Sequence, residues 1–305
     1  MPAHTCSSRP RSSLRMSTLP SLPTSSTPCL QMCLRRADPF IVMCAPNGAR
    51  RSQADHGRLP VTPAELADCA ESILAAGASM MHVHVRDDDG AHSLDADRYR
   101  DAIVAIRERI DDSLVIQVTT EACGIYTPEC QMSVVRELRP ESVSVALREL
   151  CPDRESERRA AEFYRWMSDN HVMPQHILYS AEDVARFEAL RGKGVIPEDK
   201  PFVLFVLGRY AENLTGDVSA LESFVYVVYD DVVWAVCCFG STEHDAVLAA
   251  MRQGGHARVG FENNIEMPDG CLAADNADLV GLAAVAAEDE DRVLATADDV
   301  RHLFG

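Results

Sequence analysis

Two histidines lie two residues apart in the apolar run MHVHV, which begins at Met81. Alternate side chains of a β-strand point to the same face, so His82 and His84 project side by side if this run is a strand. Such a pair of imidazoles is part of a metal site when another element supplies a further donor. The structural alternative is one histidine in the core and one at the surface, and the fold decides between the two.

Short runs rich in Val, Ile, Leu and Phe alternate with amphipathic segments of helical length after residue 37. The predicted strands are Phe40–Ala45, Ser79–Val85, Leu114–Thr120, Ser142–Leu147, Val172–Tyr179, Phe202–Leu207, Val232–Phe239 and Ala257–Glu262. Helices are predicted near 63–76, 97–109, 128–138, 155–169, 181–191, 217–227, 243–253 and 275–288. Eight such units in about 265 residues predict a single (β/α)8 TIM barrel. A doubly wound sheet is the alternative, but the turn after the first strand lacks the glycine-rich pattern of that fold.

In a TIM barrel the catalytic groups come from the carboxyl ends of the strands. His82 and His84 lie at the end of the second predicted strand, and Glu262 lies at the end of the eighth. The eighth strand closes the barrel beside the first, so these two ends are near neighbours. Two imidazoles and one carboxylate, with positions left open, are typical of a catalytic Zn²⁺ and are also compatible with Fe²⁺.

Other predicted strands also carry polar residues toward their carboxyl ends. These residues are Thr119, Thr120, Glu121, Ser144, Gln175, His176 and Arg258. A position of His176 or His244 in the pocket is compatible with this arrangement, although their spacing does not require it. We expect His92 and His256 to be structural or surface residues.

The composition excludes several classes of partner. A net charge of −18 argues against nucleic acid and anionic membrane surfaces, because phosphate binding needs clustered Lys and Arg. No apolar run approaches the roughly 20 residues needed to span a bilayer. The 11 cysteines are scattered, and no C-x-x-C occurs. A zinc ribbon or a dithiol redox motif is therefore not indicated, and we expect buried, reduced thiols in a cytoplasmic protein.

The first 37 residues differ in composition from the rest of the chain. They contain no Asp or Glu and are dominated by Ser, Thr, Pro and Arg. Such a segment cannot bury enough apolar surface to offset its chain entropy, so we predict disorder. Its composition also resembles an organellar transit peptide, and a start codon assigned too far upstream would look the same. We therefore expect two regions, an N-terminal extension over 1–37 and the barrel domain over 38–305.

From about Asp38 onward the sequence resembles the β-keto acid cleavage enzymes. The most specific matching segments are MHVHVRDDDG and GGHARVGFENN, and LVIQVTTEACG and WAVCCFG support them in the same order. The resemblance implies a zinc-dependent TIM barrel with one Zn²⁺ per chain, assembled as a homo-oligomer (a tetramer). Its reaction joins a β-keto acid and acetyl-CoA and releases acetoacetate and a new acyl-CoA.

The resemblance also assigns roles to residues of this chain. The family's metal ligands fall on His82, His84 and Glu262. The family's active-site arginine falls on Arg258, and its two hydroxyl positions near the substrate fall on Thr119 and Ser144. A metal ion that holds the ketone oxygen acidifies the adjacent C–H, and Arg258 and the hydroxyls are suited to stabilise the oxygen charge that develops.

One departure from the family concerns the base. An aspartate that works with the arginine in proton abstraction is replaced here by Asn263. An amide cannot take a proton, and an arginine alone is a poor base. Glu121 stands where the family has a glycine in a TGG-like turn, and it is the nearest candidate base by strand position. The alternative for Glu121 is a surface loop charge.

A second departure lies in the turn after the first strand. The family position that contacts the far end of the substrate can be a glutamate, which suits an amine, and here it is Arg50. A guanidinium matches a carboxylate and repels an ammonium, so we expect a substrate whose far end is anionic or neutral. In two competing arrangements, Glu121 neutralises Arg50, or Arg51 points inward in its place.

The sequence leaves alternatives for the function as well. Because Asn263 cannot act as the family's base, the second hypothesis is a metal-dependent lyase or hydrolase that cleaves a related keto acid without CoA. A degenerate site that serves only assembly is a third and weaker hypothesis.

A truncation tests the predicted boundary of the barrel domain. Deletion of residues 1–36 should leave folding and any activity intact, because no predicted element of the barrel lies in this segment. Thermal melting and solubility of the truncated and full chains provide the comparison. A substantially lower melting temperature after truncation would mean that the segment contains a structural element.

Overall fold

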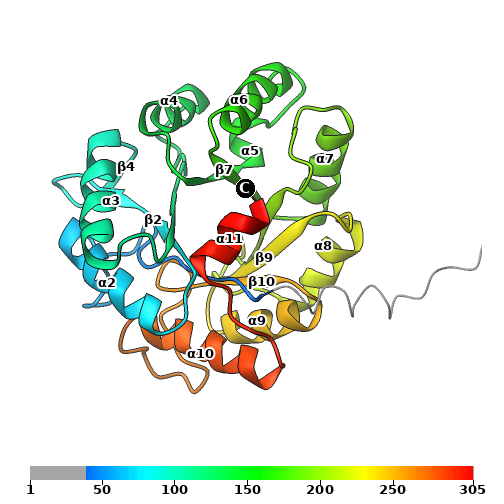
Figure 1. The fold of residues 1–305 in the computed structure, drawn as a ribbon. Coiled ribbons are helices and arrows are strands. Elements are labelled where there is room, and N and C mark those ends of the chain that lie inside the picture. Colours follow the sequence, from blue (N-terminus) through cyan, green and yellow to red (C-terminus); the bar gives the residue numbers. More distant parts are fainter. Residues whose placement is uncertain (1–38, 305) are drawn as a thin grey trace, which may run out of the picture.

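The computed structural model describes residues 39–304, so the prediction for 1–37 lies outside the described residues. Parallel strands close into a barrel with helices around its outside (Figure 1). The barrel strands are β1 (Val42–Cys44), β2 (Met80–Val83), β5 (Val115–Val118), β6 (Ser142–Ala146), β7 (Met173–Leu178), β8 (Phe202–Leu207), β9 (Val233–Cys238) and β10 (His256–Val259). The predicted TIM barrel is confirmed, and each strand lies where the apolar runs predicted one.

The order of the strands around the ring determines which site residues are neighbours. It runs β1-β10-β9-β8-β7-β6-β5-β2, and β2 closes the ring on β1. Met43 of β1 pairs with Met80 of β2 on one side and with Arg258 of β10 on the other. The strand that carries His82 is therefore separated from β10 by β1 alone. In the same ring β8 lies four positions from β2, on the opposite side of the barrel.

The outer helices match the predicted segments closely. They are α2 (Pro63–Ala75), α3 (Ala96–Ile110), α4 (Pro128–Leu138), α6 (Glu157–Asp169), α7 (Ala181–Gly192), α8 (Leu221–Val227), α9 (Glu243–Arg252) and α10 (Asn276–Asp289). Thr62 caps α2, and the Glu65 side chain accepts from the Thr62 backbone N–H, which completes a capping box. The predicted segment 217–227 is a 3-10 turn, η1 (Val218–Ala220), followed by the short α8, consistent with its β-branched and aromatic composition.

The second predicted strand is shorter than expected. It was predicted to run to Val85, but β2 ends at Val83, and His84 lies just beyond it. The chain then forms β3 (Val85–Arg86), which pairs antiparallel with β4 (His92–Ser93). The sequence pattern did not predict this hairpin, because the apolar run continues through the point where the chain leaves the barrel.

Two helices at the ends of the barrel were not predicted. The single turn α5 (Leu147–Leu150) follows β6 directly. The C-terminal helix α11 (Ala297–Phe304) lies across the barrel axis in Figure 1 and packs on the inner core. Val300 is fully buried there, and the Phe304 ring stacks on Phe202 at 4.7 Å between centroids. The helix covers the start of β8, so it closes the amino end and leaves the carboxyl end open.

Two further findings bear on the sequence predictions. Among the described residues, no helix combines the length and apolarity that crossing a membrane requires. The eight cysteines that the structure describes are free, but the expected burial holds for only four of them, since Cys69 and Cys123 are half-buried and Cys130 and Cys271 are exposed.

The role of α11 as a cover for the inner core is testable. Val300→Asp places a charge against buried apolar side chains, so it should lower the free energy of unfolding by about 3–5 kcal/mol. His302→Asp puts the same residue on the exposed face of α11 and should cost less than about 1 kcal/mol. Urea unfolding followed by circular dichroism provides the measurement. Equal losses in the two variants would mean that α11 does not seal the barrel.

Candidate metal centre and active-site cavity

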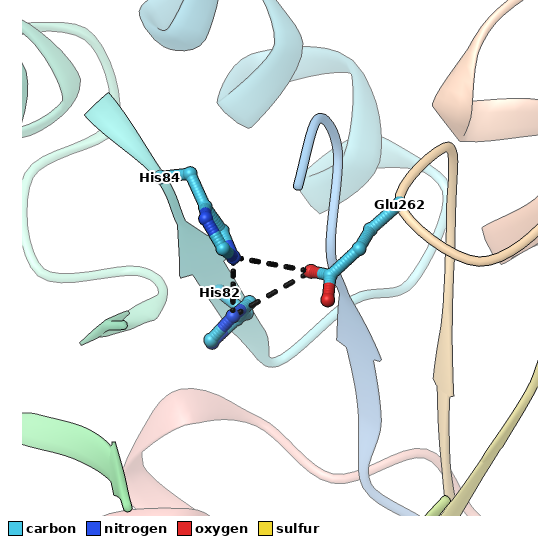
Figure 2. Close-up of side chains that lie close together, drawn as sticks. All are labelled: His82, His84 and Glu262. Atoms are coloured by element: carbon cyan, nitrogen blue, oxygen red, sulfur yellow. Dashed lines mark hydrogen bonds and ion pairs between the residues drawn. The ribbon is translucent and has the colours of Figure 1, made fainter. Parts of the chain in front are cut away.

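The three predicted metal ligands converge at the carboxyl end of the barrel (Figure 2). Nε2 of His82 lies 3.1 Å from Nε2 of His84. Oε2 of Glu262 lies 3.5 Å from the first of these nitrogens and 3.4 Å from the second. Figure 2 shows the two imidazoles at the end of β2 and Glu262 reaching them from the loop after β10. No other group in the described part of the chain gathers three potential ligands in this way.

The proton of the His82 ring is fixed by its neighbour. Nδ1 lies 2.8 Å from Oε1 of Gln117, whose own amide nitrogen donates to Ser142 Oγ and to Gln175 Oε1, both at 3.3 Å. Because Gln117 Oε1 can only accept, Nδ1 of His82 carries the hydrogen and Nε2 presents a lone pair to Glu262. Burial lowers the pKa of His82 to about 3, so this ring is neutral near pH 7.

Glu262 is ionised in this setting. Burial alone would raise the pKa of its carboxyl, but the Arg258 guanidinium and the two neighbouring imidazoles together outweigh burial and hold the pKa well below its usual range. Nη2 of Arg258 donates to Oε1 of Glu262 at 3.1 Å and contacts Sγ of Cys237 at 3.4 Å. Arg258 therefore binds one carboxylate oxygen and leaves the other, Oε2, facing the histidines.

The arrangement fits a divalent cation. Oε2 of Glu262 is buried and accepts no hydrogen bond from the described residues, although it faces two imidazole nitrogens. A carboxylate oxygen opposite a neutral lone pair is repulsive unless a positive charge lies between them. Ligands about 2.1 Å from an ion at tetrahedral angles are about 3.4 Å apart, which matches the observed spacing. The residues present thus suit a site of two histidines and one carboxylate.

The loop that carries Glu262 is fixed by the first-strand turn. Gly48 has a φ of +63°, and a Cβ there would lie 2.5 Å from Cγ of Glu262, so this close approach requires glycine. Arg51 donates to the carbonyls on either side of Glu262, at 2.8 Å to Phe261 and 3.4 Å to Asn263. The competing hypothesis that Arg51 points into the pocket is therefore wrong, and its guanidinium supports the loop from outside.

Asparagine side chains complete the support of the ligands. Asn47 donates to the His84 carbonyl at 2.9 Å and to the Pro60 carbonyl at 3.0 Å. Asn276, at the start of α10, accepts from the Phe261 backbone N–H at 2.9 Å and donates to the Pro46 carbonyl at 3.1 Å. Because these bonds are buried and tie separate segments together, they hold the ligand backbone where the side chains can meet.

One cavity adjoins the ligand cluster, with about 410 Å³ of empty space that includes its opening to solvent. The residues from the sequence analysis that line it are His82, Thr119, Thr120, Glu121, Ser144, Arg258 and Glu262. Thr119 Oγ1 accepts the Glu121 backbone N–H at 3.0 Å, which leaves the Thr119 hydroxyl hydrogen free to donate. These residues surround one cavity, as expected for residues at the carboxyl ends of barrel strands.

Three predicted site residues do not line this cavity, and one of them, His84, lies behind His82 and Glu262 in the ligand cluster. The Asn263 side chain is fully buried, and neither of its amide atoms has a hydrogen-bond partner among the described residues. Arg50 is exposed and donates to Oε1 of Glu121 at 2.6 Å. The structure therefore contains the arrangement in which Glu121 neutralises Arg50.

His92 has a structural position beside the site, because its ring lies 5.2 Å from that of His84 and its Nε2 lies 2.9 Å from the Glu121 carbonyl oxygen, whereas His176 and His244 lie elsewhere. His176 faces outward from β7 and packs between the rings of Tyr164 and Phe187. His244 lies at the start of α9, outside this cavity. As predicted, His256 is structural, since its Nδ1 accepts the Ile41 backbone N–H at 3.1 Å.

Sequence reasoning did not single out three residues of the cavity wall. Tyr179 directly follows β7, Arg209 follows β8 by two residues, and Glu149 follows β6 by three. Burial raises the pKa of Glu149 above its usual value. The signal that would have found them is position alone, because each lies just past the carboxyl end of a strand and none belongs to a recognisable motif.

Comparison with known proteins agrees with this geometry. A model of the beta-keto acid cleavage enzyme family matches residues 39–305. The 3-keto-5-aminohexanoate cleavage enzyme of Fusobacterium nucleatum subsp. nucleatum is 28% identical over 272 residues, 87% of this chain and 97% of that protein. The 3-oxoadipate:acetyl-CoA acetyltransferase of Cupriavidus necator is 24% identical over 274 residues, 88% of this chain and 95% of that protein.

A solved structure supports the fold. The apo structure of ObcA superimposes with a TM-score of 0.67 at 15% sequence identity, covering 81% of this chain and 65% of that one. At this identity the likeness concerns the barrel alone. The family match is broader, because it spans the whole described barrel and includes the two segments that carry His82, His84 and Glu262. The chain belongs to the beta-keto acid cleavage enzyme family.

Proposed function

We propose that this enzyme converts a β-keto acid and acetyl-CoA into acetoacetate and a new acyl-CoA. The observation that carries the proposal is the meeting of His82, His84 and Glu262 with Arg258 at one cavity in a member of this family. The name of the Cupriavidus necator relative, a 3-oxoadipate:acetyl-CoA acetyltransferase, supports acetyl-CoA as the co-substrate. Residues 38–305 would form the catalytic domain.

The ligand cluster is proposed to hold one Zn²⁺. When bound, the ion would act as a Lewis acid on the ketone oxygen of the substrate and make the adjacent C–H acidic. His82 and Glu262 are suited to this task, because the imidazole is held neutral by burial and the carboxylate is held ionised by Arg258. Three protein ligands leave coordination positions open for the substrate, as catalytic zinc sites do.

Arg258 and two hydroxyls are proposed to orient the substrate and stabilise charge on its oxygens. Arg258 lines the cavity, and its guanidinium is fixed there by Glu262 and Cys237. The hydroxyls of Thr119 and Ser144 line the same cavity. Fixed donors in a water-poor cavity stabilise developing negative charge without a reorganisation cost.

Glu121 is proposed as the general base. Its carboxylate lines the cavity, and Arg50 binds its Oε1, which leaves Oε2 to accept a proton from the substrate. Asn263 cannot serve, because an amide does not take a proton and its side chain does not reach the cavity wall. Glu149 is the other unassigned carboxylate of the wall, but its Oε2 already accepts from the Ala122 N–H and from Gln131.

Isotope labelling tests the proposed reaction. In the transfer, the acetyl group leaves CoA and joins the CH₂–COO⁻ fragment of the keto acid, while CoA takes the remaining acyl group. With ¹³C-labelled acetyl-CoA, mass spectrometry should therefore detect labelled acetoacetate and a new, unlabelled acyl-CoA. Cleavage products without label, formed equally well without acetyl-CoA, would instead indicate the CoA-independent lyase or hydrolase.

The metal site can be tested by variants with a matched control. The wild-type protein should contain about one divalent ion per chain, and His82→Ala and His84→Ala should each lose it together with activity. His176→Ala also removes a buried histidine, but it lies on the outer face of β7 and should keep the ion. Metal content by mass spectrometry and folding by circular dichroism give the result. Full occupancy in a folded His82→Ala, His84→Ala double variant would contradict the assignment.

The base can be tested by an isosteric change. Glu121→Gln keeps an oxygen that can accept from Arg50 but cannot take a proton, so turnover should fall by roughly 10²–10⁴-fold. Metal content and melting temperature should stay unchanged. Glu149→Gln is the comparison variant, and it should have a smaller effect. Near-normal turnover in Glu121→Gln would remove Glu121 from the base role, and a large loss in Glu149→Gln alone would transfer that role to Glu149.

A further inference from the structure

Arg209 is an arginine whose hydrogen-bonding capacity is unused at the wall of the active-site cavity. Its guanidinium donates no hydrogen bond to the described residues, and its nearest ionic partner, Oε1 of Glu121, is 3.8 Å away. The group lies 5.7 Å from the ring centroids of both Tyr210 and Phe239, so cation–π contacts help to hold it. Its side chain is 19% exposed, which places it at the edge of the cavity rather than in bulk solvent.

The other arginines near the cavity are occupied. Arg258 donates to Glu262 at 3.1 Å, and Arg51 donates to two backbone carbonyls of the Glu262 loop. Arg50 is 52% exposed and donates to Glu121 at 2.6 Å. Arg209 is therefore the guanidinium of the described cavity wall that has a planar set of donors left for a ligand. Such a fork matches a carboxylate through two parallel hydrogen bonds.

The topology places Arg209 opposite the metal ligands. It follows β8, which lies four positions around the ring from β2, the strand that leads to His82 and His84. Its contact with Glu121, in the loop after β5, means that the side chain leans over the mouth of the barrel. A substrate held by its ketone at the ligand cluster would thus extend toward Arg209 with its other end.

The charges at the mouth favour an anion there. Two arginines, Arg50 and Arg209, face Glu121, and the shorter pair neutralises Arg50. The other carboxylate of this part of the wall, Glu149, is bound by the Ala122 N–H and Gln131 and has no ion pair with Arg209, so Arg209 keeps a positive charge without a close partner. A chain with a net charge of −18 would otherwise repel an anionic substrate, so this local cation is the feature that can admit one.

We propose that Arg209 binds a carboxylate at the end of the keto acid remote from the ketone, so that the preferred substrate is a dicarboxylic β-keto acid. The inference rests on the proposed function for the identity of the reaction. Two other anions share this chemistry, namely the carboxylate next to the ketone, which every β-keto acid has, and the phosphates of CoA. The experiment separates the three.

A matched pair of substrates isolates the remote carboxylate. 3-Oxoadipate and 3-oxohexanoate have the same length, and only the first has a carboxylate at the far end. Wild-type enzyme should prefer 3-oxoadipate. Arg209→Gln should lower kcat/KM for 3-oxoadipate by about 30-fold or more, mainly through KM, and leave 3-oxohexanoate within about threefold. Arg209→Lys should recover part of the loss, because it restores the charge without the fork.

Two further variants control for charge and for position. Arg252→Gln removes a positive charge from the exposed, C-terminal end of α9, and it should change neither substrate. Arg50→Gln removes the other arginine of the mouth. Its effects on kcat/KM for the two substrates should differ less from each other than those of Arg209→Gln do. Calorimetric binding of both keto acids to metal-loaded protein without acetyl-CoA should follow the same order, whatever the reaction that follows.

Several results would overturn the proposal. Equal losses for both keto acids in Arg209→Gln would assign the arginine to the carboxylate that they share. A raised KM for acetyl-CoA with either keto acid would assign it to the CoA phosphates. A wild-type preference for 3-oxohexanoate, or a preference lost only in Arg50→Gln, would also contradict it. If binding depends on Arg209 as predicted but no acyl transfer occurs, the proposed function fails and the assignment of Arg209 stands.

Discussion

The site depends on the close approach of two electron-rich atoms, Nε2 of His82 and Oε2 of Glu262, beside the His84 ring. Burial keeps His82 neutral, Gln117 directs its lone pair toward Glu262, and Arg258 keeps that carboxylate ionised. Without a cation these atoms repel, so the protein must hold them together by other means. It does so through the turn after β1. Gly48 allows close contact with Glu262, Asn47 donates to the His84 carbonyl, and Arg51 donates to the Phe261 carbonyl. The short turn after β1 is therefore the support of the metal site.

The mouth of the barrel is organised by charge rather than by shape. Glu121 is shared between Arg50, which follows β1, and Arg209, which follows β8. The same carboxylate is the proposed base, so substrate selection and proton transfer meet at one side chain. This arrangement differs from one in which aspartate beside the metal ligand acts with the arginine, since Asn263 is buried away from the cavity.

The fold and the ligand set were predictable for physical reasons. Buried parallel strands need continuous apolar runs, and the spacing of His82 and His84 together with the strand-end rule pointed to the site. Contacts between loops were not predictable, because a loop sequence has no periodic pattern that fixes where its side chains point. The partner of Arg50 therefore remained an open alternative, and Arg209 was not considered. The C-terminal helix was missed because its eight residues follow the last repeat and belong to no strand–helix unit.

X-ray absorption at the zinc edge of the purified enzyme tests the central claim most directly. The account predicts a zinc ion surrounded by nitrogen and oxygen at about 2.0–2.2 Å, with imidazole scattering from two histidines. Replacement of Glu262 by Gln should alter the first shell without adding sulfur. A sulfur ligand at about 2.3 Å would contradict the account, because it would transfer the ion to a thiolate such as the neighbouring Cys237. An absence of bound metal in active enzyme would contradict it as well.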